Sequence, residues 1–170
     1  SLGDNVRSLR RHIAADPLLR AAAGLPARFH TICSHTRWAS VGAITEANCH
    51  PVDNLTAGPP PGGRGTIHVC LNGDIDNYRT LLAACRDEGY TVCREVTTDT
   101  KIIPLQIERH YRRCGDMLEA FRAAVNDFEG SHAISMHTDL APGKLFLAQR
   151  GSGQAIFVGL AADHYMPASE

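Results

Sequence analysis

Two oppositely charged residues and an amide pair in this sequence can together bind an amino acid and stabilise an oxyanion. Arg37 carries a planar guanidinium that can bond both oxygens of an α-carboxylate. Asp99 stands at a predicted loop-to-helix junction and can hold the matching α-ammonium group. The side-chain amide of Asn72 and the backbone N–H of Gly73 follow a predicted strand, so both donors can point at one oxygen. These four residues predict a site for an amino acid.

Each of these residues also has a simpler structural explanation. An Asn-Gly pair after a strand is more often a hairpin turn than a binding site. Asp99, inside Thr-Asp-Thr, is equally explained as a helix cap with no other role. Taken alone, Arg37 is typical of a solvated charge, Trp38 of a packing aromatic, and His50 of a structural histidine. Only their order along the chain favours a shared function.

Apolar residues recur at helical spacing in four parts of the chain, and Pro17 is expected to divide the first. The predicted helices cover 4–23, 76–88, 98–113 and 116–128.

Shorter β-branched or apolar runs predict strands, the last four forming a meander with Gly-rich turns. The predicted strands cover 66–71, 90–93, 132–137, 144–149, 155–159 and 164–167, and 31–39 is predicted to be a strand that runs into a polar loop. The Pro- and Gly-rich segment 57–65 is expected to be an exposed loop. Strands, then helices, then a run of strands indicate sheets with helices layered outside them.

The composition is that of one ordinary domain of 170 residues, with a net charge of -1 and charges of both signs scattered along it. No basic stripe favours nucleic acid or a membrane surface, and no apolar run is long enough to span a bilayer. The six cysteines show no CxxC and no metal-ligand spacing, so we expect reduced thiols, no metal and a cytoplasmic location.

Four short motifs follow one another: HTRWA at 35–39, NxHP at 48–51, NGDIxNY at 72–78 and TDT at 98–100. In this order they resemble the class II glutamine amidotransferases, and among them the glutamine:fructose-6-phosphate aminotransferases. The resemblance extends over nearly the whole chain. It implies an α+β fold, the four-layer αββα sandwich of N-terminal-nucleophile hydrolases, truncated here at its N-terminus. Residues 1–170 are then expected to be a partial glutaminase domain that lacks its first strand.

The resemblance also assigns roles to residues. It implies that Arg37 binds the α-carboxylate of glutamine, that Asp99 binds the α-ammonium, and that the Asn-Gly pair at 72–73 forms the oxyanion hole. Trp38 corresponds to a tryptophan that helps to gate ammonia, and His50 to a histidine of the site. The implied partners are glutamine and a sugar-isomerase domain of the same parent chain, which is a candidate homodimer, and no cofactor is implied.

In this family an N-terminal cysteine supplies the thiol that attacks the glutamine amide, and its own α-amine acts as the base. An α-amine titrates near ~8, so it can accept a proton at physiological pH. The chain instead begins Ser1-Leu2, and an internal cysteine has no free α-amine. We therefore expect a truncated and inactive glutaminase domain of an enzyme that transfers ammonia to a sugar phosphate such as fructose 6-phosphate.

Several positions depart from the family pattern. Val41 and Leu71 stand where the family has histidine, Lys101 replaces a glutamate, and 55–65 is an insertion. These departures leave two alternatives: an amidotransferase with another acceptor, or a glutamine-binding domain without catalysis.

Overall fold

The computed structural model of the chain describes residues 2–26, 30–36, 40–56 and 65–169. The chain divides into two compact units, Ser1–Ile32 and Cys33–Glu170. The predicted loop at 57–65 lies outside the described residues except for its last residue, and so do the candidate site residues Arg37 and Trp38. Within the described part of the chain, no helix is long and apolar enough to cross a membrane.

The first unit contains two helices, α1 (Leu2–Ala15) and α2 (Pro17–Gly24). The helical prediction for 4–23, with a division at Pro17, is confirmed. Asp16 caps α2, because its carboxylate accepts the backbone N–H of Leu19 at 2.9 Å. Pro17 occupies the first helical position, where a missing N–H breaks no helix hydrogen bond. The proline therefore begins a new helix.

The second unit is built on a four-stranded antiparallel sheet with the order β1-β2-β3-β4. Its strands are β1 (Val52–Asp53), β2 (Ile67–Gly73), β3 (His132–Thr138) and β4 (Phe146–Arg150). Strand β2 has Ile67, Val69 and Leu71 in the hydrophobic core, whereas Cys70 and Asn72, at the alternate positions, border a pocket. This alternation is the period of two that lets one strand contribute to a core and to a site at once.

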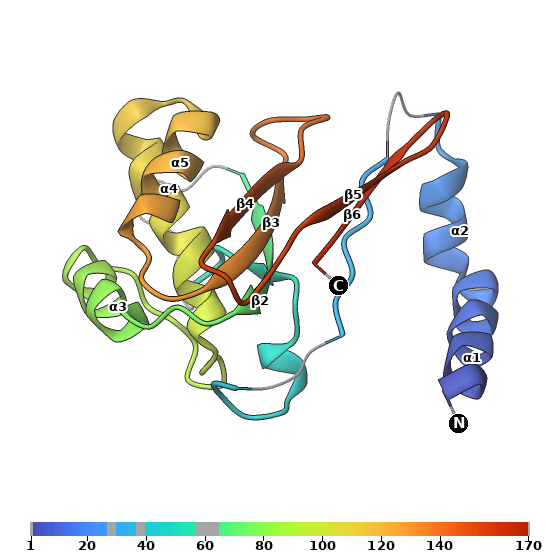
Figure 1. The fold of residues 1–170 in the computed structure, drawn as a ribbon, viewed down its shortest axis with the longest axis horizontal. Helices are drawn as coiled ribbons and strands as arrows, with labels where there is room; N and C mark the ends of the chain where they lie inside the picture. The colour runs from blue at the N-terminus through green and yellow to red at the C-terminus, as the bar shows by residue number, and fades with distance from the viewer. Residues whose placement is uncertain (1, 27–29, 37–39, 57–64, 170) are drawn as a thin grey trace. The chain divides into compact units, whose positions relative to one another are not determined.

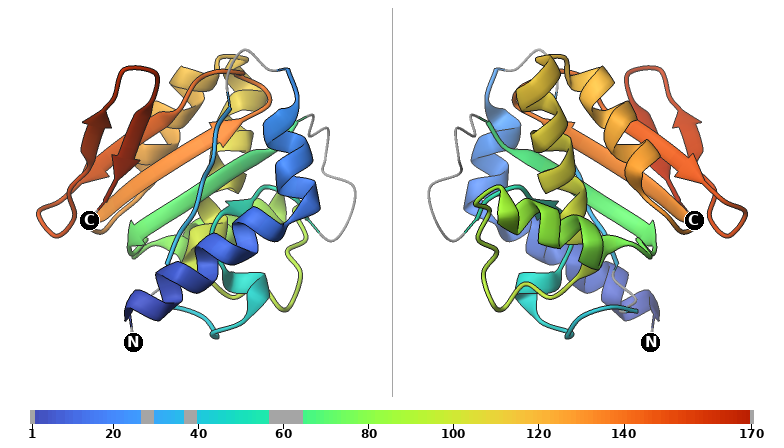
Figure 2. Two further views of the ribbon diagram at one scale, coloured as in Figure 1. Left: turned by 90° about the vertical axis from the view of Figure 1, so that its right-hand side faces the viewer. Right: turned by 90° about the vertical axis from the view of Figure 1, so that its left-hand side faces the viewer.

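Three helices of this unit, α3 (Tyr78–Asp87), α4 (Ile102–Cys114) and α5 (Met117–Asp127), follow the sequence prediction closely. Helices α4 and α5 cover one face of the sheet (Figures 1 and 2). Their apolar stripes meet the core residues of β2 and β3 in a single cluster. Helix α4 is thereby fixed against β2, with its first turn near the end of that strand.

The last two strands, β5 (Phe157–Leu160) and β6 (Tyr165–Ala168), form a separate two-stranded antiparallel sheet. All four strands predicted after residue 130 are present, within two residues of their predicted bounds. Helices and antiparallel strands occupy separate stretches of the chain, which confirms the α+β class.

Two predicted strands are wrong. Residues 30–36 have no strand partner among the described residues, although they are rich in β-branched side chains. The segment 90–93 is also irregular. It is held by one side chain and not by strand pairing, since Tyr90 is buried and its hydroxyl accepts a hydrogen bond from Arg112 at 2.9 Å. A short apolar run can be buried through a single side chain and needs no strand pairing.

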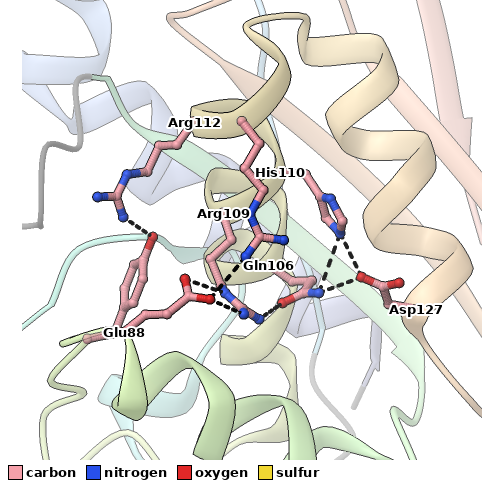
Figure 3. A network of polar contacts seen from close by, with 8 residues as sticks. Glu88, Gln106, Arg109, His110, Arg112 and Asp127 are labelled. Atoms are coloured by element: carbon pink, nitrogen blue, oxygen red, sulfur yellow. Dashed lines mark hydrogen bonds and ion pairs between the residues drawn. The ribbon is translucent and has the colours of Figure 1, made fainter.

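A polar network joins the three helices (Figure 3). Arg109 of α4 donates to both carboxylate oxygens of Glu88, which follows α3, and to the amide oxygen of Gln106 at 2.6 Å. Asp127, at the end of α5, accepts from Gln106 at 2.5 Å and lies 2.6 Å from the ring Nε2 of His110. The hydrogen bond from Arg109 lowers the pKa of Glu88, so the carboxylate stays charged. The network fixes α3 and α5 against α4.

Replacing Arg109 with methionine tests this network. We expect Arg109→Met to lower the free energy of unfolding by roughly 2 kcal/mol, because it removes charge-assisted hydrogen bonds while keeping an apolar stem. Arg122→Met is the matched control, since Arg122 pairs with Glu119 on the helix surface with 64% of its side chain exposed. Urea unfolding followed by circular dichroism measures both variants. Equal losses in the two would contradict a special role for the network.

Candidate functional site

The Asn-Gly pair at 72–73 is the end of a paired strand. Asn72 and Gly73 lie opposite Ala133 and His132 in the β2–β3 ladder, so the hairpin-turn interpretation is wrong. Gly73 has a φ of +112°, and a Cβ at this position would lie 2.1 Å from the carbonyl oxygen of Ser131. Close backbone packing therefore demands glycine at residue 73. The side-chain amide of the preceding residue, Asn72, donates to the Ser169 hydroxyl at 3.1 Å.

Asp99 lies beside this strand end, at the start of the 3-10 helix η2 (Asp99–Lys101) that leads into α4. One carboxylate oxygen accepts the backbone N–H of Ile75 at 2.9 Å, and the other accepts that of Thr100 at 2.9 Å. The cap of η2 is Thr98, whose hydroxyl accepts the Thr100 N–H at 3.4 Å, so Asp99 is not the helix cap considered from the sequence. Its contact with Ile75 reaches across to the segment that follows Gly73. Asp99 thus joins the second and third motifs.

The charge of Asp99 has no cation beside it in the described part of the chain. Asp99 is 3% exposed and forms no ion pair with a described Lys, Arg or His. Burial raises the pKa of this carboxyl, and the nearby Asp74 raises it further, against the two backbone hydrogen bonds. A buried carboxylate held by backbone donors, with no counter-ion among the described residues, is suited to accept a cationic ligand.

His50 links the segment before β1 to the end of β2 and to the Thr-Asp-Thr segment. Its Nε2 lies 2.9 Å from the Thr100 hydroxyl, and its Nδ1 accepts the backbone N–H of Leu71 at 3.4 Å. With Nδ1 as an acceptor, a neutral imidazole carries its proton on Nε2 and donates it to Thr100. The ring of His35 lies 4.4 Å from that of His50. His50 is therefore placed between the strand end and the Thr-Asp-Thr segment.

Asn48 is a positioning residue that sequence analysis did not single out. It is fully buried, and its side-chain oxygen accepts the backbone N–H groups of Thr97 and Thr98 at 2.7 and 3.0 Å. Its amide donates to the Ala43 carbonyl at 3.0 Å and to the Thr45 hydroxyl at 3.0 Å. Its place as the first residue of the NxHP motif was the available signal.

Ser40 is a second such residue. Its hydroxyl donates to the carboxylate of Asp74 at 2.5 Å, directly after the Asn-Gly pair. His35 and Ser40 flank the segment 37–39 in sequence, and both contact this region. The structure therefore brings together Asn72, Gly73, Asp99 and His50, whereas Arg37 and Trp38 are not described.

Lys101, which departs from the family pattern, has a structural role. Its ammonium group donates to the carbonyls of Asp53 and Leu55 at 2.6 and 2.7 Å and pairs with the Asp53 carboxylate at 3.1 Å. These three acceptors satisfy a buried lysine completely. Lys101 fixes the start of α4 to β1 and does not contribute a charge to the site.

A pocket opens next to the strand end, lined by Asn72 and Leu71 of β2, by Ser34 and His35, and by Ser169 after β6. Hydroxyl, amide and imidazole groups meet apolar strand residues here, a composition typical of small-molecule sites. Among the described residues, no group of three or more His, Cys, Asp or Glu side chains could hold a metal ion.

Comparison with known proteins gives sequence relatives over most of the chain. It is 37% identical over 136 residues to a glutamine--fructose-6-phosphate aminotransferase (isomerizing) of Clostridium tetani, covering 80% of this chain and 20% of the relative. It is 32% identical over 165 residues to the protein of the same name in Streptomyces coelicolor, covering 96% of this chain and 23% of the relative. The chain thus spans about a fifth of the length of these relatives. No family model matches the sequence.

Solved structures agree on the fold. Glutamine phosphoribosylpyrophosphate amidotransferase from B. subtilis superposes with a TM-score of 0.60 at 19% identity, covering 79% of this chain and 26% of the other. A structure described as the allosteric regulatory enzyme of purine biosynthesis gives a TM-score of 0.56 at 18% identity, covering 72% of this chain and 24% of the other. With the motifs and the geometry above, these findings place the chain among the class II, N-terminal-nucleophile glutamine amidotransferase domains. Its sequence relatives belong to the branch of glutamine:fructose-6-phosphate aminotransferases.

The requirement for glycine at residue 73 can be tested with a matched pair of variants. Gly73→Ala is expected to cost at least ~3 kcal/mol of stability, because it combines a left-handed backbone with a clash against Ser131. Gly89→Ala is the control, since Gly89 has a φ of +91° but no heavy atom within 4 Å of the added Cβ. It should cost only ~1–2 kcal/mol. Urea unfolding of both variants measures the difference. Equal losses of stability would contradict the claim that the close approach to Ser131 requires glycine at residue 73.

Proposed function

We propose that this chain is the glutamine-hydrolysing part of an amidotransferase that supplies ammonia to a sugar phosphate such as fructose 6-phosphate. The observation that carries the proposal is the hydrogen bond from the Ile75 N–H to Asp99, which places the Thr-Asp-Thr carboxylate beside the Asn-Gly strand end. The sequence relatives bear the name of an enzyme with this activity, and that name supports the choice of acceptor.

In this proposal Asp99 binds the α-ammonium group of glutamine. The carboxylate already accepts two backbone N–H groups at 2.9 Å, and a carboxylate has lone pairs for further donors. A bound ammonium group supplies the counter-charge that this buried group lacks among the described residues. Arg37 is proposed to bind the α-carboxylate, and Trp38 to close over the site where ammonia leaves. His35 and Ser40, which flank these residues in sequence, contact the region, and this supports both assignments.

Asn72 and Gly73 are proposed as the oxyanion hole. The amide of Asn72 lines the pocket, and the neighbouring ladder and the close contact at Gly73 fix the strand end. Donors held in place before the reaction stabilise a developing oxyanion without reorganisation. The hydrogen bond from Asn72 to Ser169 shows that the amide has a donor directed toward the lining of the pocket. His50 supports this strand end through Leu71 and is proposed as a site histidine.

The acceptor is proposed to bind in a sugar-isomerase domain of the parent chain. The relatives are about five times as long as the region matched, which leaves room for such a domain in them. An amidotransferase with another acceptor would have the same glutamine site but no binding of fructose 6-phosphate. A non-catalytic glutamine-binding domain would bind glutamine without releasing ammonia.

The role of Asp99 can be tested by glutamine binding. Asp99→Asn should weaken the binding of L-glutamine at least ~10-fold, because the amide keeps the shape but loses the charge opposite the ammonium group. Asp87→Asn is the matched control, since Asp87 is exposed on α3. Isothermal titration calorimetry of the chain and both variants measures the affinities. If Asp99→Asn bound glutamine as tightly as Asp87→Asn does, the assignment of Asp99 would be wrong.

A polypeptide of residues 1–170 should release no ammonia from glutamine, because none of its six cysteines carries a free α-amine. An ammonia assay with purified polypeptide, with a heat-inactivated sample as control, measures this. The full-length protein should release ammonia, and fructose 6-phosphate should accept it. Release by residues 1–170 that is lost in Ser1→Ala would instead make Ser1 the nucleophile.

A further inference from the structure

Two thiols face each other beside the pocket. The Sγ atoms of Cys33 and Cys70 lie 3.2 Å apart, although 37 positions separate the residues in sequence. Cys33 is half-buried in the irregular segment before His35, and Cys70 is buried in β2. Cys70 borders the pocket two residues before Asn72. Of the four remaining cysteines, Cys49, Cys93 and Cys114 are exposed and Cys85 is buried.

The two thiols have opposite acidities. A hydrogen bond with Cys70 lowers the pKa of Cys33 to about 7, and a hydrogen bond from Ser135 contributes in the same direction against burial. The hydrogen bond with Cys33 and burial raise the pKa of Cys70. Cys33 is therefore the more acidic thiol of the pair, with Cys70 as the protonated donor beside it.

We propose that Cys33 and Cys70 form an oxidant-reactive pair that closes to a disulfide when the protein meets a peroxide. This inference does not depend on the glutamine-hydrolysing activity. The distance between the sulfurs carries it, since a disulfide bond of about 2.0 Å requires an approach of only about 1 Å. The half-buried Cys33 is the sulfur that the oxidant reaches first.

The reaction is balanced with hydrogen peroxide as oxidant. The Cys33 thiolate attacks one peroxide oxygen and breaks the O–O bond; the departing hydroxide takes a proton and leaves as water, and Cys33 becomes a sulfenic acid. The Cys70 sulfur then attacks the Cys33 sulfur, and the S–O bond breaks. The thiol proton of Cys70 leaves with the sulfenic oxygen as a second water. Two thiols are oxidised and one peroxide is reduced.

The disulfide would connect the segment that carries His35 to the strand that carries Asn72. Both residues line the pocket, so the bond would restrain its two walls. It would also close a long loop in the unfolded chain and so raise the thermal unfolding midpoint. A reductant such as dithiothreitol would reverse both effects.

Peptide mapping tests the pair directly. The protein is treated with hydrogen peroxide, its remaining thiols are alkylated, and it is digested with trypsin. Cys33 and Cys70 lie in the tryptic peptides 29–37 and 65–79, each with a single cysteine, so a link between them is unambiguous. We expect this linked peptide as the main disulfide, a higher thermal midpoint, and loss of both on reduction.

Single substitutions separate the two roles. In Cys70→Ser the sulfenic acid on Cys33 should persist and be trapped by a 1,3-dione, because no second thiol is left beside it to close the disulfide. Cys114→Ser, which removes an exposed thiol at the end of α4, should leave the 29–37 to 65–79 link unchanged. The proposal would be overturned if peroxide oxidised the exposed cysteines while these two peptides stayed unlinked. It would also be overturned if Cys70→Ser gave no trapped Cys33.

Discussion

The site depends on one buried carboxylate that is hydrogen-bonded on both sides. Asp99 accepts the backbone N–H groups of Ile75 and Thr100, and so fixes the start of α4 to the segment after β2. Removing an anion from water is costly unless donors replace the solvent. Two backbone donors offset part of that cost, and the raised pKa shows that part of it remains. A cationic ligand would offset the rest, which links the stability of this corner to its proposed chemistry.

The surroundings keep the carboxylate in place. Asn48 holds the backbone ahead of it, and Lys101 anchors the turn behind it to β1. Helix α4 is packed into the core that it shares with β2, so neither partner of the hydrogen bond at Ile75 can move alone. Gly73 permits the strand end to approach Ser131 closely enough to form this geometry. Packing, backbone conformation and polar contacts thus converge on one place.

Much of this arrangement could be predicted from the sequence, because helical spacing and short β-branched runs are local signals. The motifs indicated the fold class and predicted that Asp99 and Asn72 belong to one site. Other features depend on contacts between distant residues. The run at 31–36 resembles a strand but lacks a described partner, and the contact of Ser40 with Asp74 spans 34 positions. The thiol contact of Cys33 could not be predicted, because cysteine spacing alone does not show which residues face each other across a sheet.

The ionisation of Asp99 measures the central claim most directly. In the protein without glutamine, carboxyl-carbon NMR should show Asp99 titrating above the ordinary 3.8, because burial outweighs its hydrogen bonds. Saturating L-glutamine should lower that pKa, since an ammonium group beside the carboxylate favours its charged form. Asp87, exposed on α3, should be unaffected by glutamine. A pKa of Asp99 that stays unchanged at saturating glutamine would contradict the account.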